Sequence, residues 1–557
     1  MGTGMIVASA ELLTRGAQLL PSLLALALGA AGFVILFFAT ERLALRSPST
    51  AGRVLEGGLF LIALLGILTF FATFVVYAGT NVLSDHAESW NLCLAWSWGH
   101  GAPLYHQMDA VPRYSSAYGP GLYVVLNLIL QLVQNPIFCK LVIGALLLIG
   151  ILLVWMSCRP ASGLLSTVVA TGYFVLALSG MTPYAQASYW LRAEPLLIFS
   201  AASAIIGSTR PRAVVAATVV AFALGTATAF KPHGAIYVLP AIGILYSRFG
   251  FKVAVCSALG GAFIGGLFFT CFPGVDARNY LKILGMTARH GINFRMFSGN
   301  VFRLLIISVP LFVFGYWNLV VTRRFLRSVM RAHFPFVGTL FIGLVVALVP
   351  ASKVGAGPHH LLPFLPWLYW VALSELSHLS ADGNQIQGKE GRVLALASSF
   401  VLIWLFVPAA ERCRRFASEV LAAARAEEAI PGEVRGILHQ FRGRNLAMGT
   451  AGNDTAHLVL HKWRLVIAGN SYLFEPSAIM DYVYAGFPLS EETIATMTNG
   501  SIEGWVIPAG GEPFSMTNLY DFNQKLFPER MLEEFRRNYV IEYSTQHFDV
   551  WVYRQRE

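Results

Sequence analysis

Long apolar runs separated by short polar loops dominate the first 410 residues of the chain. A helix needs about 20 mostly apolar residues to cross a bilayer, and somewhat fewer where neighbouring helices shelter it. The pattern therefore predicts a polytopic α-helical membrane protein with about twelve transmembrane helices. The spans are expected near residues 18–40, 58–79, 137–157, 163–181, 195–209, 213–230, 234–247, 252–271, 301–321, 334–350, 361–376 and 393–409.

The apolar segment 120–134 is short for a full crossing. If it did cross, every later loop would change sides, and the arginine clusters that follow would face outward. We therefore expect a re-entrant or juxtamembrane helix at the outer face, which begins at the turn formed by Tyr118, Gly119 and Pro120.

Basic residues occur in alternate loops along the chain. Lysine and arginine collect on the cytoplasmic side of membrane proteins, so this alternation sets the orientation. It places segments 79–119, 182–194, 272–300 and 351–360, together with the tail after residue 410, on the outer face.

The pattern changes after residue 410, where charged residues return and apolar runs shorten. We expect a transmembrane domain over 1–410, a helical connector over 411–440 and an extracytoplasmic α/β domain over 441–557. Within the last domain, strands are predicted at 458–469, 504–510 and 548–555, and amphipathic helices at 490–499 and 527–539.

Composition supports lipid as the main solvent. The chain is 56% hydrophobic and only 13% charged, whereas soluble domains carry roughly 25% charged residues. The net charge of +10 could suggest nucleic acid, but the basic residues lie mainly in short loops. Membrane topology and anionic headgroups account for that distribution, so membrane lipids are expected partners and nucleic acid is not.

The long outer loop 79–119 holds the strongest candidates for catalysis. Asp85 and Glu88 are three residues apart and would share one face of a helix. A carboxylate at the bilayer boundary is costly unless it is paired or used, and it could act as a general base toward a hydroxyl. The structural alternative is that Ser84 or Asp85 caps a helix.

Other polar clusters are expected on the same face. Each has a structural alternative: an interfacial ion pair for arginine with glutamate, or lysines that reach toward headgroups. Adjacent histidines on a helix point about 100° apart, so metal binding by both is not expected. Together the clusters describe a cleft for an anionic ligand beside a base. They comprise Arg192 with Glu194, Lys231 with His233, Lys353 with His359 and His360, and Arg289 in the loop 272–300.

The order of these motifs resembles the glycosyltransferase C (GT-C) superfamily, which includes protein O-mannosyltransferases and the lipid A aminoarabinose transferase. The resemblance covers almost the whole chain, and the order and sidedness of short motifs carry it. The matching elements are the acidic motif Asp85–Glu88, the turn Tyr118–Pro120, Arg192–Pro195, Phe230–His233, and Lys353–Gly355 with Leu362–Pro363.

The resemblance implies a GT-C fold and inverting transfer of a sugar from a polyprenyl-phosphate donor. Asp85 would deprotonate the acceptor hydroxyl, although the spacing of the acidic motif leaves Glu88 open as the base. Residues implied to bind the donor phosphate are Lys231, Lys353 and Arg289. Residues implied to position the substrates are Arg192, Glu194, Tyr118, His233, His359 and His360. A divalent cation, Mg or Mn, is an open possibility, with Asp85 and Glu194 as its candidate ligands.

The acceptor implied by the resemblance is a hydroxyl of a lipid, a glycan or a protein. We expect an enzyme of the cell envelope, in a bacterial inner membrane, with its site facing the periplasm. Three alternatives stay open: a polysaccharide polymerase or ligase that uses a lipid-diphosphate donor, a lipid or sugar transporter, and a scaffold without catalytic activity.

Overall fold

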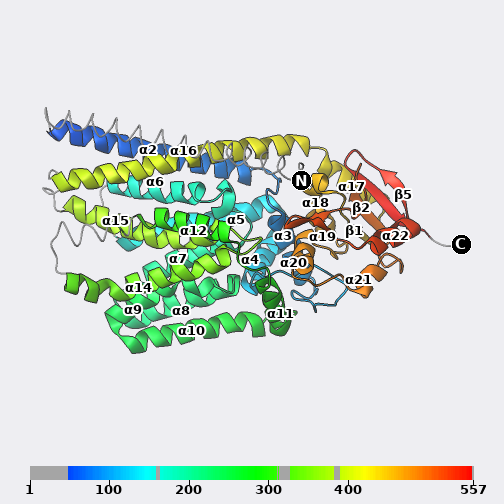
Figure 1. Ribbon diagram of the computed structural model, residues 1–557, viewed down its shortest axis with the longest axis horizontal. Helices are drawn as coiled ribbons and strands as arrows, with labels where there is room; N and C mark the ends of the chain where they lie inside the picture. The colour runs from blue at the N-terminus through cyan, green and yellow to red at the C-terminus, as the bar shows by residue number, and fades with distance from the viewer. Residues whose placement is uncertain (1–47, 159–163, 310–311, 313–325, 382–388, 555–557) are drawn as a thin grey trace, which may run out of the picture.

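The computed structural model describes residues 48–158, 164–309, 312, 326–381 and 389–554. Figure 1 shows an elongated molecule in which long helices run side by side and the C-terminal residues form a smaller domain at one end. The predicted first span, 18–40, lies outside the described residues, as does most of the second half of the span predicted at 301–321.

The helical bundle matches most of the predicted spans. Five helices of the described chain are long and apolar enough to cross a membrane: Gly57–Ala78, Pro136–Cys158, Ala213–Phe230, Phe251–Thr270 and Phe334–Ala351. Large apolar side chains on the bundle are exposed, among them Leu61, Phe222 and Phe263. An apolar surface of this kind suits lipid rather than water. The helices are α2 (Pro48–Ala78), α5 (Pro136–Cys158), α6 (Leu164–Gly180), α7 (Ala193–Ser208), α8 (Ala213–Phe230), α9 (Leu239–Phe249), α10 (Phe251–Thr270), α12 (Phe294–Ile307), α14 (Leu326–Ala351), α15 (Leu365–Ala381) and α16 (Lys389–Ala426).

Three bundle elements differ in their ends from the prediction. A 3₁₀ turn, η2 (Gly234–Tyr237), precedes α9, and another, η4 (Pro358–Phe364), precedes α15. Pro240 and Pro363 lack the backbone N–H of a continuous α-helix, which explains why each regular helix starts late. The last predicted span and the start of the connector form one 38-residue helix, α16.

The short apolar segment forms a separate helix, α4 (Pro120–Leu132). Thirteen residues make a helix of roughly 20 Å, which is too short for a core of about 30 Å. The preceding turn packs tightly on the end of α8: Gly119 N–H donates to the Phe230 carbonyl at 3.0 Å. A side chain at Gly119 would overlap the Ala229 carbonyl, so this close approach requires glycine.

Three helical elements lie in the loops that the sequence predicted on the outer face, and Figure 1 shows α3 and α11 at the end of the bundle that meets the C-terminal domain. They are α3 (His86–Gly99), η1 (Ala185–Ser188) and α11 (Ala277–Ala288). Two backbone hydrogen bonds of Arg113 join the first outer loop to the domain. Its N–H donates to the Leu473 carbonyl at 2.7 Å, and its carbonyl accepts from the Glu475 N–H at 2.9 Å. The first outer loop is therefore held between the bundle and the domain.

The C-terminal domain contains a four-stranded sheet in the order β1-β2-β6-β5. Strands β1 and β2 are parallel, the other pairs are antiparallel, and Trp505 lies opposite Trp551. Phe474, Trp505 and Phe514 belong to its apolar core. The elements are α17 (Ile430–Gln440), β1 (Leu446–Met448), η5 (Asn453–Thr455), α18 (Ala456–Val459), α19 (Lys462–Ile467), α20 (Pro476–Tyr484), α21 (Glu491–Ala495), β2 (Gly504–Pro508), β3 (Thr517–Asn518), β4 (Asp521–Lys525), α22 (Glu529–Asn538), β5 (Tyr539–Ser544) and β6 (Phe548–Tyr553).

One predicted strand of this domain is wrong. Segment 458–469 forms the helices α18 and α19 instead. Its less buried positions, Leu460, Arg464 and Ile467, recur every three to four residues, which is a helical period rather than the alternation of a strand. The strands predicted at 504–510 and 548–555 and both amphipathic helices are confirmed.

Candidate active site

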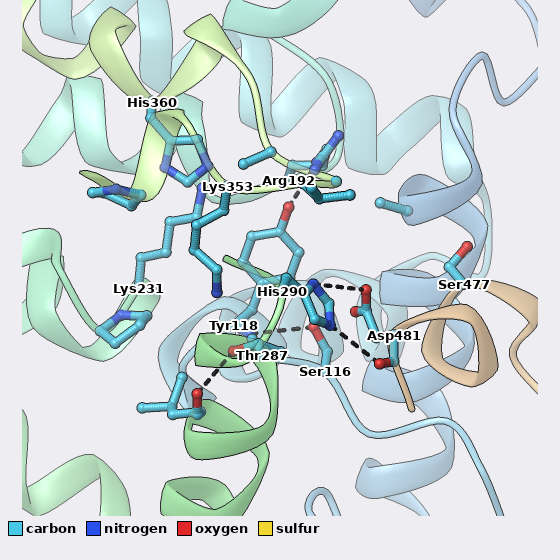
Figure 2. A pocket seen from close by; sticks show the side chains of 18 of the residues that line it. Ser116, Tyr118, Arg192, Lys231, Thr287, His290, Lys353, His360, Ser477 and Asp481 are labelled. Atoms are coloured by element: carbon cyan, nitrogen blue, oxygen red, sulfur yellow. Dashed lines mark hydrogen bonds and ion pairs between the residues drawn. The ribbon is translucent and has the colours of Figure 1, made fainter. Parts of the chain in front are cut away.

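A cavity of about 280 Å³ lies where the ends of the bundle helices meet the C-terminal domain. Figure 2 shows that charged and aromatic side chains from widely separated segments point into it. The polar and aromatic residues lining it include His86, Tyr118, Arg192, Lys231, His233, His290, Lys353, His359, His360, Asp481 and Tyr520. The structure thus brings together most of the clusters that the sequence predicted on one face.

Lys231 forms one wall of the cavity at the end of α8. Its Nζ lies 2.5 Å from Oε1 of Glu194, which stands in the first turn of α7. Glu194 is fully buried and also accepts a hydrogen bond from Trp190 Nε1 at 3.0 Å. Glu194 therefore lies behind the lining as a counter-charge, while the lysine faces the cavity.

Arg192 contacts two other predicted site residues, Tyr118 and Asp85. Its Nε donates to the Tyr118 hydroxyl at 2.7 Å, and its NH1 lies 3.4 Å from Oδ1 of Asp85. The guanidinium also stacks on the ring of Trp190, with 4.1 Å to the ring centroid. These contacts hold the arginine at the edge of the cavity.

Asp85 is the N-cap of α3, as the structural alternative proposed. Its Oδ1 accepts from the Ala87 N–H at 2.8 Å. Its side chain is only 10% exposed, and the next residues, His86 and Ala87, line the cavity. Burial alone would raise its pKa, but the positive charges of His86 and Arg192 outweigh burial and lower the pKa. The carboxylate is thus ionised at neutral pH and lies beside the cavity.

Glu88 lies away from the cavity. It is fully buried, and its carboxylate accepts from the Tyr77 hydroxyl and from the N–H groups of Ser84 at 2.7 Å and Leu191 at 3.2 Å. It also completes the capping box with Asp85. This geometry does not support Glu88 as a group that touches substrate; the residue ties the start of α3 to its neighbours.

The three histidines cluster beside Lys231. His360 Nδ1 and His233 Nε2 are 3.0 Å apart, and the rings of His359 and His360 are 4.6 Å apart between centroids. Burial lowers the pKa of His233 to about 3, with the Lys231 charge adding to the effect, and burial lowers the pKa of His359 to about 3. Both imidazoles are therefore neutral at pH 7 and serve as hydrogen-bonding groups.

The donor set does not fit a divalent cation. Asp85 and Glu194, the candidate ligands if a metal is bound, each form an ion pair with a different cationic side chain. Within the ranges that the structure describes, no three His, Cys, Asp or Glu residues are grouped as a metal site would need.

The loop 272–300 contributes a different residue from the one predicted. Arg289 is exposed and lies over the ring of Phe487, 4.7 Å from the centroid, outside the cavity lining. The adjacent His290 lines the cavity instead. Lys353 also lines it, and burial lowers the pKa of this lysine against the opposing pull of Asp481.

The C-terminal domain supplies three lining residues that sequence reasoning missed, Ser477, Asp481 and Tyr520. Asp481 lies in α20, and the Tyr520 hydroxyl donates to its Oδ1 at 3.2 Å. His290 Nδ1 is 3.9 Å from the same oxygen, and its Nε2 is 3.1 Å from the Asp481 carbonyl (Figure 2). No local motif marks Asp481, because its role depends on the docking of the domain onto the bundle.

Comparison with known proteins gives a likeness of fold. No family model matches the chain, and no curated protein sequence matches it. Among solved structures, ArnT from Cupriavidus metallidurans bound to undecaprenyl phosphate has a TM-score of 0.50 and 12% identity, covering 89% of this chain and 98% of ArnT. The apo form of the same ArnT has a TM-score of 0.48 and 12% identity, covering 89% and 97%. The chain therefore has a GT-C membrane fold, as the motif order predicted.

Proposed function

We propose that this protein is an inverting glycosyltransferase that moves a sugar from a polyprenyl-phosphate donor to an acceptor hydroxyl. The observation that carries the proposal is the cavity itself, which cationic side chains line beside the ionised Asp85. The fold adds support, since it is similar to that of a protein crystallised with undecaprenyl phosphate.

The donor phosphate binds at the wall formed by Lys231, Lys353 and Arg192, all of which line the cavity. One buried carboxylate, Glu194, offsets Lys231 from behind. Asp85 likewise pairs with Arg192, so the three cations of the wall exceed their two carboxylate partners by one charge, which stabilises the phosphate as it leaves. Neutral His233 and His359 add hydrogen-bonding capacity next to it.

In the proposed reaction, Asp85 accepts the proton of the acceptor hydroxyl. The hydroxyl oxygen forms a bond with the anomeric carbon, and the bond between that carbon and the phosphate oxygen breaks. Polyprenyl phosphate leaves with the electron pair, and the configuration at the anomeric carbon inverts. Arg192 keeps the carboxylate ionised and oriented before the acceptor arrives.

The polyprenyl chain lies along the apolar side of α4 in this proposal. Leu128 and Leu132 are exposed on that helix, at 61% and 78%, and Tyr118 at its start lines the cavity. The alternation of basic loops supports an outer-face position for the cavity, which in a bacterial inner membrane is the periplasmic side.

The test compares the wild type with Asp85→Asn, both reconstituted in nanodiscs and offered a panel of polyprenyl-phosphate sugars with a membrane glycolipid extract. We expect the wild type to release polyprenyl phosphate, in EDTA as well as in Mg²⁺ or Mn²⁺, and the variant to be slower by about 10²–10⁴-fold. Asp454→Asn, an exposed acid in η5, serves as the matched control.

Equal turnover by Asp85→Asn would contradict the assignment of the base. If folded wild type releases nothing from monophosphate donors but turns over a lipid-diphosphate donor, the polymerase or ligase alternative replaces the proposal. Movement of labelled lipid across the membrane without sugar transfer would instead favour transport.

A further inference from the structure

The C-terminal domain closes the cavity with an acidic group rather than a basic one. The Asp481 side chain is 22% exposed and lines the cavity together with Ser477 and Tyr520. The Tyr520 hydroxyl donates to Asp481 Oδ1 at 3.2 Å. This end therefore presents a carboxylate and hydroxyl groups to whatever enters.

A close contact between the bundle and the domain fixes the position of this acid. Gly355, two residues after Lys353, has a positive φ of 80°. A Cβ at Gly355 would lie 2.5 Å from the Tyr520 hydroxyl oxygen, so the loop and the tyrosine meet where only glycine fits. The carboxylate consequently stands at a defined place relative to the bundle lysines.

The two ends of the cavity differ in the chemistry that they recognise. The bundle end carries Lys231 and Arg192, which suit a phosphate. The domain end carries Asp481, which as a carboxylate accepts hydrogen bonds from hydroxyl groups and repels a second phosphate. Figure 2 shows Lys231 and Asp481 on opposite sides of the cavity.

We infer that Asp481 and Tyr520 form the acceptor-binding end of this cavity, and that the acceptor is a neutral, hydroxyl-bearing carbohydrate rather than a phosphate group. This inference rests on the proposed function and names the substrate class for that site. Neighbouring hydroxyls of a sugar donate to the carboxylate, and the Tyr520 oxygen is a further partner within the same end.

The test measures lipid binding by the full chain in a detergent without a sugar headgroup. The probes are a hexosyl diacylglycerol and phosphatidic acid with the same acyl chains, and native mass spectrometry reports the retained lipid. Loss of a charge-assisted hydrogen bond weakens binding by about tenfold to a hundredfold. We expect that loss for the hexosyl lipid in Asp481→Asn, a smaller loss in Tyr520→Phe, and unchanged binding of both lipids in Asp454→Asn.

A second variant and a kinetic measurement separate recognition from folding. Gly355→Ala should displace Tyr520 and weaken hexosyl-lipid binding, while undecaprenyl phosphate, which binds at the bundle end, is retained as by the wild type. If the hexosyl lipid is an acceptor, Asp481→Asn should raise its KM at least about tenfold with kcat changed far less.

Equal retention of the hexosyl lipid by wild type and Asp481→Asn overturns the inference, as does a loss confined to phosphatidic acid. The proposed function fails separately, if no polyprenyl-phosphate donor is turned over by the wild type. Carbohydrate binding that depends on Asp481 would still support the inference in that case.

Discussion

Two buried lysine–glutamate pairs in this protein have nearly the same geometry and different surroundings. In the bundle, Lys231 Nζ lies 2.5 Å from Glu194, with side chains 7% and 0% exposed. In the C-terminal domain, Lys462 Nζ lies 2.6 Å from Glu475, and the two side chains are 2% and 1% exposed. Burial and distance do not distinguish these pairs.

The neighbours of each pair make the difference. Arg192 and His359 lie near Glu194, and Lys231 faces the cavity that Arg192 and Lys353 also line. Lys462 and Glu475 line a separate cavity of about 210 Å³, whose lining has no second lysine or arginine among the described residues. Glu475 instead accepts from the Tyr472 hydroxyl at 2.8 Å and caps α20. A buried ion pair by itself therefore indicates little; an excess of cations facing a cavity indicates a site for an anion.

Replacing each pair by neutral residues gives the sharpest separation. Lys231→Met with Glu194→Gln should reduce sugar transfer by about 10²–10³-fold, because a donor to the leaving phosphate is lost. Lys462→Met with Glu475→Gln should leave the activity of the folded protein within about threefold, because exchanging a whole buried pair is often close to neutral. Polyprenyl phosphate release and thermal unfolding measure the two effects. Equal loss of activity in both double variants would remove the distinction.

Glu88 tests whether a buried acid of the active-site motif is structural. Glu88→Gln places an NH₂ group where the carboxylate accepts from Ser84 and Leu191, so we expect a loss of stability of about 1–3 kcal/mol. Activity per folded molecule should stay within about tenfold of wild type, far above that of Asp85→Asn. A fully stable variant with no turnover would return Glu88 to the catalytic group.

The lowered pKa of His359 predicts that the stability of the protein depends on pH. Burial depresses its folded-state pKa to about 3, against about 6.5 in an unfolded chain. The unfolded state therefore binds the proton first, and stability falls as pH decreases from about 6.5 toward 3. We expect about 1 kcal/mol lost between pH 6.5 and 5.5 from this group. Thermal unfolding of His359→Gln should show a shallower slope across that range, and an unchanged slope would contradict the assignment.

Substitution of Arg289 should have the smallest effect on stability and activity, and it tests whether the loop 272–300 contributes this arginine to the site. Arg289→Ala should change stability by no more than about 0.5 kcal/mol, as for most surface positions. It should also leave polyprenyl phosphate release within about twofold, because the side chain lies outside the cavity. A large rise in donor KM would show that the arginine swings inward when the donor binds.

The local sequence was sufficient for most of the bundle. The span predicted at 137–157 is α5 at Pro136–Cys158, and the span predicted at 213–230 is α8 with the same limits. A helix in lipid satisfies its backbone hydrogen bonds internally, so the apolar run alone defines it. The same reasoning failed at 458–469, where a water-facing domain offers both strand and helix partners to a short apolar run.

The same distinction between local sequence and tertiary contacts applies to the residues of the site. From the sequence alone, the acidic motif, the order of the basic and histidine motifs, and their position on one common face could be derived, because each depends on nearby residues and on sidedness. Only the tertiary structure decided that His290 rather than Arg289 faces the cavity, that Glu88 is buried among hydrogen-bond donors, and that Asp481 of a separate domain closes the site. Those outcomes depend on helix rotation and domain docking, which set long-range contacts that no local pattern encodes.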